Sequence, residues 1–150
     1  IMAYSHIAHD CIINDDCVIV NNVQIGGHVK IDNFAIIGGG TLIHQFSNIG
    51  AHAMVAGGSL VRKDIPPFCK AGKEPISFKG VNTIGLKRRN FTSESINQIQ
   101  NIYRIIYLEG RNTSQAINKI KNDIKDSNEK KIVLDFIKNS DRGIIKGLFD

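Results

Sequence analysis

The run Ile19-Val20-Asn21-Asn22-Val23-Gln24-Ile25-Gly26-Gly27-His28-Val29-Lys30-Ile31 returns to isoleucine at every sixth position. A position four residues later in each repeat is always small or β-branched, from Ser5 to Ser59. A period of six fits neither an amphipathic helix nor a simple alternating strand. The same register extends in both directions, and its aliphatic positions are Ile1, Ile7, Ile13, Ile19, Ile25, Ile31, Ile37, Ile43, Ile49, Val55 and Val61.

This period predicts a parallel β-helix, in which each hexapeptide supplies one short strand and one turn. Three hexapeptides complete a triangular coil, so the large aliphatic side chains fill the prism and the small ones lie near its corners. Coils stack at about 4.8 Å, the ordinary spacing between strands. The repeat stops near Val61, and Pro66-Pro67 break the ladder. We therefore expect the β-helix over residues 1–66.

The second half of the chain changes character. Residues 67–90 have no clear period and are predicted to be an irregular connection. Residues 91–150 show helical spacing of apolar residues and predict a small α-helical domain. We expect helices over about 92–109, from 113 onward and over 127–137, with Thr92 and Thr113 as N-caps and Gly110 as a stop.

Composition restricts the class of protein. The chain is 42% hydrophobic and 22% charged, which is typical of a globular protein. No apolar run is long enough to span a membrane, and no secretory leader is recognisable at the start. The chain opens in the middle of its own repeat, so we expect a piece of a longer protein. Three cysteines without close pairing argue against a disulfide scaffold and favour a reducing cytoplasm, with Cys11 and Cys17 as small core residues.

Charge divides the chain. Residues 1–62 hold two basic and four acidic residues, a net charge of −2, whereas residues 63–150 hold 17 basic and 10 acidic residues, a net charge of +7. A basic second half suggests an acidic partner or simply a solvated helical surface. No recognition helix or aromatic-rich basic strand is apparent, so nucleic acid is disfavoured.

Histidines gather on the repeat although its core needs none. His9, His28 and His44 are spaced by about one coil, so they form a column on the prism together with His6. Such a column suits two chemistries. Three imidazoles can ligate zinc, or one imidazole can act as a general base with a carboxylate such as Asp10 behind it. The N–H of Gly27 is a candidate oxyanion donor, or Gly27 is only a turn residue.

Several motifs resemble the UDP-N-acetylglucosamine acyltransferases, which belong to the hexapeptide-repeat acyltransferases. Order and spacing agree over the whole chain, which would match the C-terminal three-fifths of such an enzyme. Lys73-Glu74-Pro75 is similar to members from Bacteroidetes. The other motifs that carry the resemblance are His6-Ile7-Ala8-His9-Asp10-Cys11, Gly27-His28-Val29, Phe34-Ala35-Ile36-Ile37-Gly38-Gly39, His44-Gln45-Phe46, Ile49-Gly50-Ala51-His52 and Gly85-Leu86-Lys87-Arg88-Arg89.

The resemblance implies a left-handed β-helix and a role for each matched residue. His9 would be the general base, Asp10 its support and the Gly27 amide the oxyanion donor. Gly57 would border the acyl chain. One departure is Ile84, where the family often has an acid. Substrate contacts would come from His6, His28, His44, Gln45, Asn82, Arg88 and Arg89.

The resemblance further implies transfer of an (R)-3-hydroxyacyl chain from acyl carrier protein to the glucosamine 3-hydroxyl of UDP-N-acetylglucosamine, the first step of lipid A synthesis. It implies a cytoplasmic homotrimer with active sites between prisms. No metal, no cofactor of the enzyme's own and no covalent acyl-enzyme would be needed. Three alternatives stay open: another hexapeptide-repeat acyltransferase, a zinc enzyme similar to γ-carbonic anhydrase, and a non-catalytic scaffold.

Overall fold

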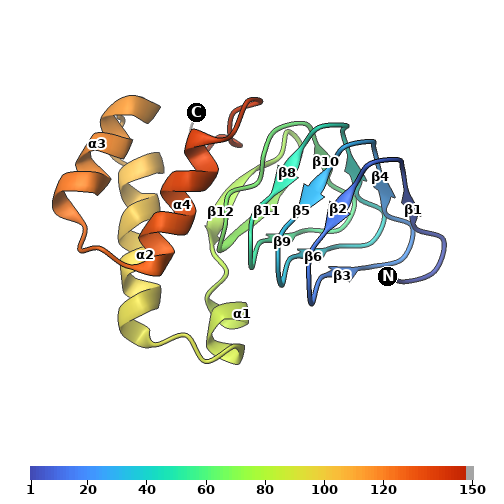
Figure 1. Ribbon diagram of the computed structural model, residues 1–150, viewed down its shortest axis with the longest axis horizontal. Helices are drawn as coiled ribbons and strands as arrows, with labels where there is room; N and C mark the ends of the chain where they lie inside the picture. Colours follow the sequence, from blue (N-terminus) through green and yellow to red (C-terminus); the bar gives the residue numbers. More distant parts are fainter. Residues whose placement is uncertain (148–150) are drawn as a thin grey trace.

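The protein is a prism of stacked β-coils with a group of helices beside one end (Figure 1). The computed structural model describes residues 1–147. The prism is a left-handed parallel β-helix, as predicted. The N-terminus lies at the end of the prism remote from the helices (Figure 1). No helix among the described residues is both long and apolar enough to cross a membrane.

Each face of the prism is a parallel sheet, and each strand pairs with the strand 18 residues later. Ile7 lies opposite Ile25, which lies opposite Ile43, so the inward column follows the predicted register. The first sheet contains β1 (His6–Ile7), β4 (Gln24–Ile25), β7 (Leu42–Ile43) and β10 (Leu60–Val61); the second contains β2 (Ile12–Ile13), β5 (Lys30–Ile31) and β8 (Asn48–Ile49); the third begins with β3 (Val18–Ile19), β6 (Ile36–Ile37) and β9 (Met54–Val55).

The corners of the prism repeat one backbone conformation. A residue with positive φ recurs at every sixth position, and glycine holds this position only at Gly40 and Gly58. Asparagine and aspartate tolerate this left-handed region better than most residues, whereas the aromatic residues here are held in it by the stacked coils. The non-glycine residues at these corners are Tyr4, Asp10, Asp16, Asn22, His28, Phe34, Phe46 and His52.

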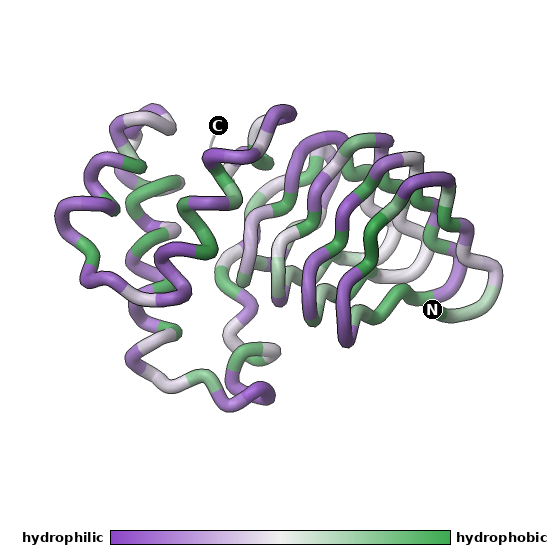
Figure 2. Tube along the Cα trace, viewed as in Figure 1, coloured by the Kyte–Doolittle hydropathy of each residue, from purple (hydrophilic) through white to green (hydrophobic). Residues whose placement is uncertain are grey.

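The interior of the prism is dry and aliphatic. Ile19, Ile31 and Ile37 have no exposed surface, and the small positions pack beside them, including Ala35 and Ala53. Figure 2 shows the resulting alternation of hydrophobic and hydrophilic segments along each coil. The predicted core role of Cys11 and Cys17 agrees with their partial burial against this cluster.

Residues 67–90 are more regular than the sequence predicts. β11 (Cys69–Gly72) continues the third sheet by pairing in parallel with β9. It then forms an antiparallel pair with β12 (Ser77–Val81), and α1 (Thr83–Arg88) follows. The prolines lie at a corner, where they need not donate to a ladder. The β-helix therefore extends beyond residue 66.

Three longer helices form a second core beside the prism. They are α2 (Ser93–Tyr107), α3 (Thr113–Asp123) and α4 (Asn128–Lys138). Thr92 caps α2 as predicted, but the side chain of Asn112, not Thr113, caps α3 through a reciprocal capping box with Gln115. Ile99, Ile102 and Ile120 are fully buried between the helices.

The helices and the C-terminal segment are tied to the prism by polar contacts. The buried Tyr103 hydroxyl donates to the carbonyl of Pro67. The Asp64 carboxylate, which has no exposed surface, accepts hydrogen bonds from the Asn48 amide and from the Ser140 hydroxyl. The Asp64 backbone pairs with Gly143 and Ile145. Residues 140–145 therefore close the last coil of the prism.

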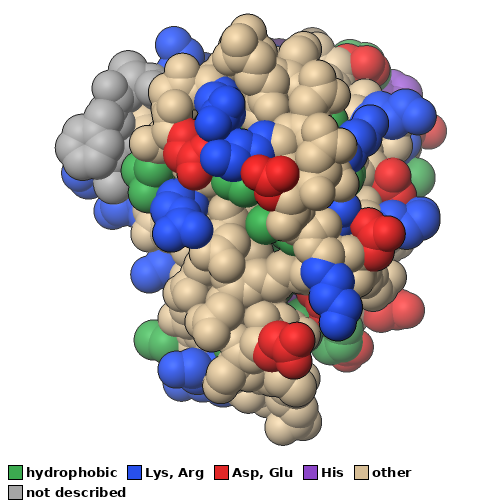
Figure 3. All heavy atoms as spheres, turned by 90° about the vertical axis from the view of Figure 1, so that its left-hand side faces the viewer, with side chains coloured by type: hydrophobic (Ala, Val, Ile, Leu, Met, Phe, Trp, Pro, Cys, Tyr) green, Lys and Arg blue, Asp and Glu red, His purple; other side chains and the backbone are tan. Residues whose placement is uncertain are grey.

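Basic side chains on the helical end are interspersed with acidic ones (Figure 3). Lys130 has a structural role, since its buried ammonium donates to the carbonyls of Lys121 and Ile124 and pairs with Asp126. Lys130 therefore departs from the solvated-surface interpretation, whereas the exposed Lys121 and Lys131 agree with it.

Candidate active site

The candidate site lies on one long edge of the prism, where the first sheet turns into the second. Turns between β1 and β2, β4 and β5, and β7 and β8 stack there at offsets of 18 residues. We call residues 8–10, 26–28 and 44–46, together with the exposed His6 of β1, the histidine edge. Equivalent positions place His9, Gly27 and Gln45 in one column. Asp10, His28 and Phe46 form the column next to it.

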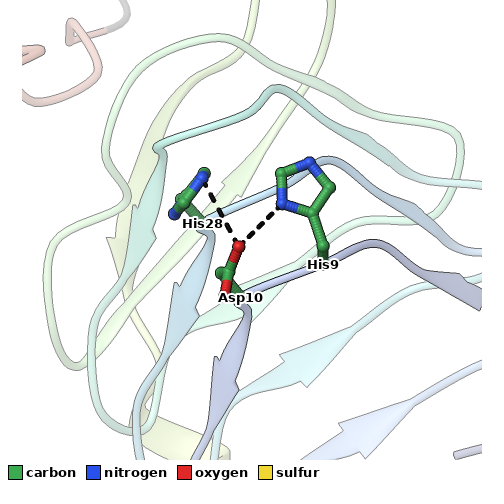
Figure 4. A group of neighbouring side chains, drawn as sticks. All are labelled: His9, Asp10 and His28. Carbon is green, nitrogen blue, oxygen red and sulfur yellow. Dashed lines mark hydrogen bonds and ion pairs between the residues drawn. The ribbon is translucent and has the colours of Figure 1, made fainter.

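His9 and Asp10 form a pair although they are adjacent in sequence. Their Nδ1 and Oδ2 atoms are 2.9 Å apart. In an extended strand the two side chains would point to opposite faces, but Asp10 has a φ of 59° at the corner, which turns its carboxylate toward the ring (Figure 4). The hydrogen bond with His9, assisted by the charge of His28, lowers the pKa of Asp10. The carboxylate is therefore ionised at neutral pH and accepts the hydrogen bond.

His28 completes a compact group above this pair. Its Nε2 lies 3.8 Å from Asp10 Oδ2, and its ring meets the His9 ring edge-on with centroids 5.0 Å apart. On its other side the His28 ring stacks on Phe46, with ring centroids 4.7 Å apart and planes nearly parallel. The motif His44-Gln45-Phe46 gave Phe46 no role of its own, although its position 18 residues after His28 predicts this contact.

Gly27 lies directly beneath the His9 ring. A Cβ built on Gly27 would lie 2.8 Å from His9 Cε1 and 2.9 Å from Nε2, so a larger residue would push the His9 ring out of this position. Within residues 1–147 no protein acceptor is found for the Gly27 N–H. A free backbone donor next to an imidazole is the arrangement that acyl transfer to a hydroxyl requires.

The remaining predicted residues of this edge are also exposed on it. His6 lies in β1, and His44 Nδ1 contacts the Gln45 carbonyl oxygen at 3.0 Å. The same carbonyl accepts a hydrogen bond of 3.4 Å from the Arg142 guanidinium, which also donates to the Arg62 carbonyl. Arg142 could not be predicted from the sequence to lie at this edge, because no local pattern connects it with residue 45.

Arg88 and Arg89 lie elsewhere in the single chain. Arg89 covers the Phe34 ring, with its Cζ atom 5.0 Å from the ring centroid, on the edge between the second and third sheets. Asn82 is buried, caps α1 through Gly85 and donates to the His52 carbonyl. One chain therefore does not bring these residues to His9, and the Asn82 amide is already engaged.

Gly57 occupies the third edge of the prism, where the third sheet turns into the first. A Cβ on Gly57 would lie 3.0 Å from the Gly39 carbonyl oxygen. The three edges thus carry three different groups of predicted residues: the histidines, the Arg89 region and Gly57.

His52 lies among aromatic rings on the edge between the second and third sheets, which we call the Arg89 edge. It stacks with Phe34 at 4.9 Å and with Phe68 at 5.7 Å, and it meets Phe91 edge-on. Burial, assisted by the positive charge of Arg89, lowers the pKa of His52 to about 4. Its buried Nδ1 has no partner among the described residues. His52 is therefore neutral at physiological pH.

Comparison with known proteins agrees with this geometry. A sequence profile for domain 2 of UDP-N-acetylglucosamine O-acyltransferase matches residues 64–145, more than half of the chain. An acyl-[acyl-carrier-protein]–UDP-N-acetylglucosamine O-acyltransferase of Thiobacillus denitrificans is 42% identical over 146 residues. That alignment covers 97% of this chain and 57% of the relative.

Solved structures give the same result. The UDP-N-acetylglucosamine acyltransferase of Bacteroides fragilis is 46% identical with a TM-score of 0.92, covering 95% of this chain and 56% of that one. The enzyme of Francisella novicida is 38% identical with a TM-score of 0.95, covering 99% and 55%. The chain spans a little over half the length of these relatives, and it belongs to the UDP-N-acetylglucosamine O-acyltransferase family.

Proposed function

We propose that the protein containing this chain transfers an (R)-3-hydroxyacyl group from acyl carrier protein to the 3-hydroxyl of the glucosamine in UDP-N-acetylglucosamine, as the first step of lipid A synthesis. The observation that carries the proposal is the His9–Asp10 pair held over Gly27 in a chain of this family.

His9 acts as the general base. Because the ionised Asp10 carboxylate can only accept, His9 Nδ1 carries the proton of their hydrogen bond, and Nε2 keeps a lone pair for the sugar hydroxyl. The hydroxyl oxygen attacks the thioester carbonyl as its proton passes to Nε2. A base positioned in this way contributes about 10²–10⁴ in rate.

Gly27 receives the charge that develops on the carbonyl oxygen. Its N–H lies in the same corner as the base and has no protein acceptor among residues 1–147. One such donor is worth about 10²–10³ in rate. The tetrahedral intermediate collapses when the carrier thiolate leaves and takes a proton.

Transfer is direct, without an acyl-enzyme. Donor and acceptor bound together need no covalent relay. Cys69 and Cys17 are unsuited as nucleophiles, since burial raises the pKa of both thiols and keeps them protonated. Cys11 packs against the core of the prism, and its thiol donates to the Gly26 carbonyl. The proposed reaction requires no metal and no cofactor beyond the carrier's own phosphopantetheine.

The substrate contacts require more than one copy of the chain. His6, His28, His44 and Gln45 line the histidine edge, whereas Arg88, Arg89 and Gly57 lie on the other two edges. We propose a homotrimer in which the histidine edge of one subunit faces the Arg89 edge of a neighbour. The arginines then meet the diphosphate or the acidic carrier, and Gly57 borders the acyl chain. Asn82 acts there by holding α1 and its arginines in place.

The decisive experiment is an acyl-transfer assay with the full-length protein. Acyl carrier protein and coenzyme A donors carrying the same 3-hydroxyacyl chain are compared with UDP-N-acetylglucosamine as acceptor. We expect transfer from the carrier donor, with the product esterified at the 3-hydroxyl. Preference for coenzyme A with another acceptor would assign the protein to a different hexapeptide-repeat acyltransferase. The three free thiols fit a reducing cytoplasm, which we propose as its location.

A further inference from the structure

Three possible metal ligands meet at the histidine edge. His9 Nδ1, Asp10 Oδ2 and His28 Nε2 all lie within 4.8 Å of one another, and all three residues are exposed. Asp10 Oδ2 is central, at 2.9 Å from the His9 nitrogen and 3.8 Å from the His28 nitrogen. Figure 4 shows the two rings, from neighbouring coils, directed at the same carboxylate oxygen.

These distances suit a first-row transition metal. Zinc binds imidazole nitrogen and carboxylate oxygen at about 2.0–2.2 Å, which places neighbouring ligand atoms about 3–3.5 Å apart in tetrahedral geometry. The two separations from Asp10 Oδ2, 2.9 and 3.8 Å, bracket this range, and the two histidine nitrogens lie within 4.8 Å of each other. Rotation of the exposed His9 and His28 side chains would bring all three atoms onto one ion. Two imidazoles with one carboxylate favour zinc, cobalt or nickel over magnesium and calcium, which prefer oxygen ligands.

The ligands are also held in place before any metal arrives. His28 is stacked on Phe46 and edge-on to His9, which restricts its ring. Asp10 and His28 lie at backbone corners fixed by the stacked coils, with φ of 59° in each. The exposed side of the cluster leaves room for water to complete the coordination sphere.

We propose that His9, Asp10 and His28 form a binding site for a divalent transition-metal ion, and that the bound ion switches the acyltransferase off. The ion takes the lone pair of His9 Nδ1, so the single proton of the neutral ring resides on Nε2. Nε2 then donates and no longer accepts, and the base is lost without any net change in protons. Asp10 then binds the ion and no longer accepts the hydrogen bond from His9. The inhibitory part of this proposal rests on the proposed function, whereas the binding part does not.

Binding is tested on the full-length protein by titration with Co²⁺, followed by its visible absorption, and by calorimetry with Zn²⁺. We expect one ion per chain. His28→Asn removes one ligand while keeping a residue that tolerates the left-handed corner, as Asn22 does at an equivalent position. Its affinity should fall by more than about tenfold, because loss of even an outer partner of a metal ligand costs about 10–100-fold. His44→Gln, a histidine of the same edge outside the cluster, is the matched control and should bind as the wild type does.

Inhibition is tested separately in the acyl-transfer assay. Zn²⁺ should suppress transfer by the wild type, a chelator should restore it, and the residual activity of His28→Asn should be markedly less sensitive to Zn²⁺. The proposal is overturned if no ion binds, if His44→Gln weakens binding as much as His28→Asn, or if a chelator abolishes transfer, which would make the metal catalytic. A protein that binds Co²⁺ through His28 but transfers no acyl group contradicts the proposed function and supports the site.

Discussion

The imidazole of His9 lies so close to Gly27 that a methyl group on that residue would lie 2.8 Å from His9 Cε1. The base and the proposed oxyanion donor are thus immediate neighbours, and a larger residue at position 27 would displace the His9 ring. They come from consecutive coils of the prism, and the stacking of coils sets their separation.

Gly27→Ala should therefore reduce transfer strongly without unfolding the protein, because the added methyl group pushes the His9 ring away from the Gly27 N–H. We expect a loss of about 10² or more in kcat, because the displaced His9 ring no longer acts as a well-positioned general base, whereas alanine keeps its own N–H. A double-mutant cycle with His9→Ala provides the check: the two losses should be far from additive. Additive losses would show that Gly27 does not act through this contact.

His9→Ala should lower kcat by about 10²–10⁴ and leave the thermal midpoint unchanged, because the side chain is 72% exposed. Asp10→Asn keeps a residue suited to its corner and should cause a smaller loss. Steady-state rates and thermal melts of both variants are needed. A His9→Ala protein that retains more than a tenth of the activity would rule out His9 as the base.

Ile31→Asp should unfold the prism, whereas Lys30→Asp in the same strand, β5, should be tolerated. Ile31 has no exposed surface, while Lys30 points to solvent. An unpaired carboxylate in the dry interior costs several kcal/mol, comparable with the whole stability of a domain. Circular dichroism during heating distinguishes the two. Equal stability of both variants would contradict the six-residue register.

Arg88→Ala and Arg89→Ala should raise KM and change kcat little, because neither charge acts at the reacting carbon. A charged hydrogen bond is worth about 1.5–3 kcal/mol, so KM should rise by about tenfold or more. The ratio of mutant to wild-type KM should shrink at high salt, where screening already weakens the wild-type contact. KM values for both substrates at two ionic strengths test this, and unchanged values at low salt would remove the arginines from the site.

His52 should make the folded protein sensitive to acid. Its pKa is about 4 in the folded state, against 6.5 when unperturbed, so the unfolded chain binds the extra proton between these values. Stability contributed by the neutral ring is complete above pH 6.5 and is lost as the pH falls toward about 4. The two charged residues near His52 act in opposite directions, since Arg89 lowers and Asp32 raises the pKa of His52.

The measurement for His52 is the dependence of the thermal midpoint on pH. His52→Asn keeps a residue suited to the corner but lacks the titrating ring, so its midpoint should fall less steeply than that of the wild type between pH 6.5 and pH 4. Parallel curves would mean that His52 titrates normally.

The prism could be predicted from the sequence because its period is local. Once every sixth residue is known to point inward, Ile19 through Val61 are assigned to the core without further information, and they are buried. Ile1 keeps the period but is 74% exposed, because an inward position is buried only where a coil covers it. Residues 69–81 were missed, since β11 joins the third sheet through partners rather than through its own pattern.

The candidate site could be predicted only in part. The spacing of 18 brought His9, Gly27 and His28 to one edge, and the corner needed for the His9–Asp10 contact is present. The position of Arg89 against Phe34, the engaged amide of Asn82 and the contact of Arg142 with Gln45 join residues 30 to 97 positions apart. Contacts of this kind depend on how the helices pack against the prism, and the spacing of residues along the sequence does not predict that packing.

The pairing of Asp64 with Gly143 and Ile145 has a consequence for the order of events during synthesis. Residues 140–145 are synthesised long after the coils. While α2, α3 and α4 are made, the backbone N–H and carbonyl of Asp64 therefore lack their partners, and its carboxylate has Asn48 but not yet Ser140. An unsealed strand edge of that kind can recruit a strand from another nascent chain. The last coil is therefore complete only after residues 140–145 have been synthesised. In a chain that stops before residue 140, the backbone groups of Asp64 would remain unpaired.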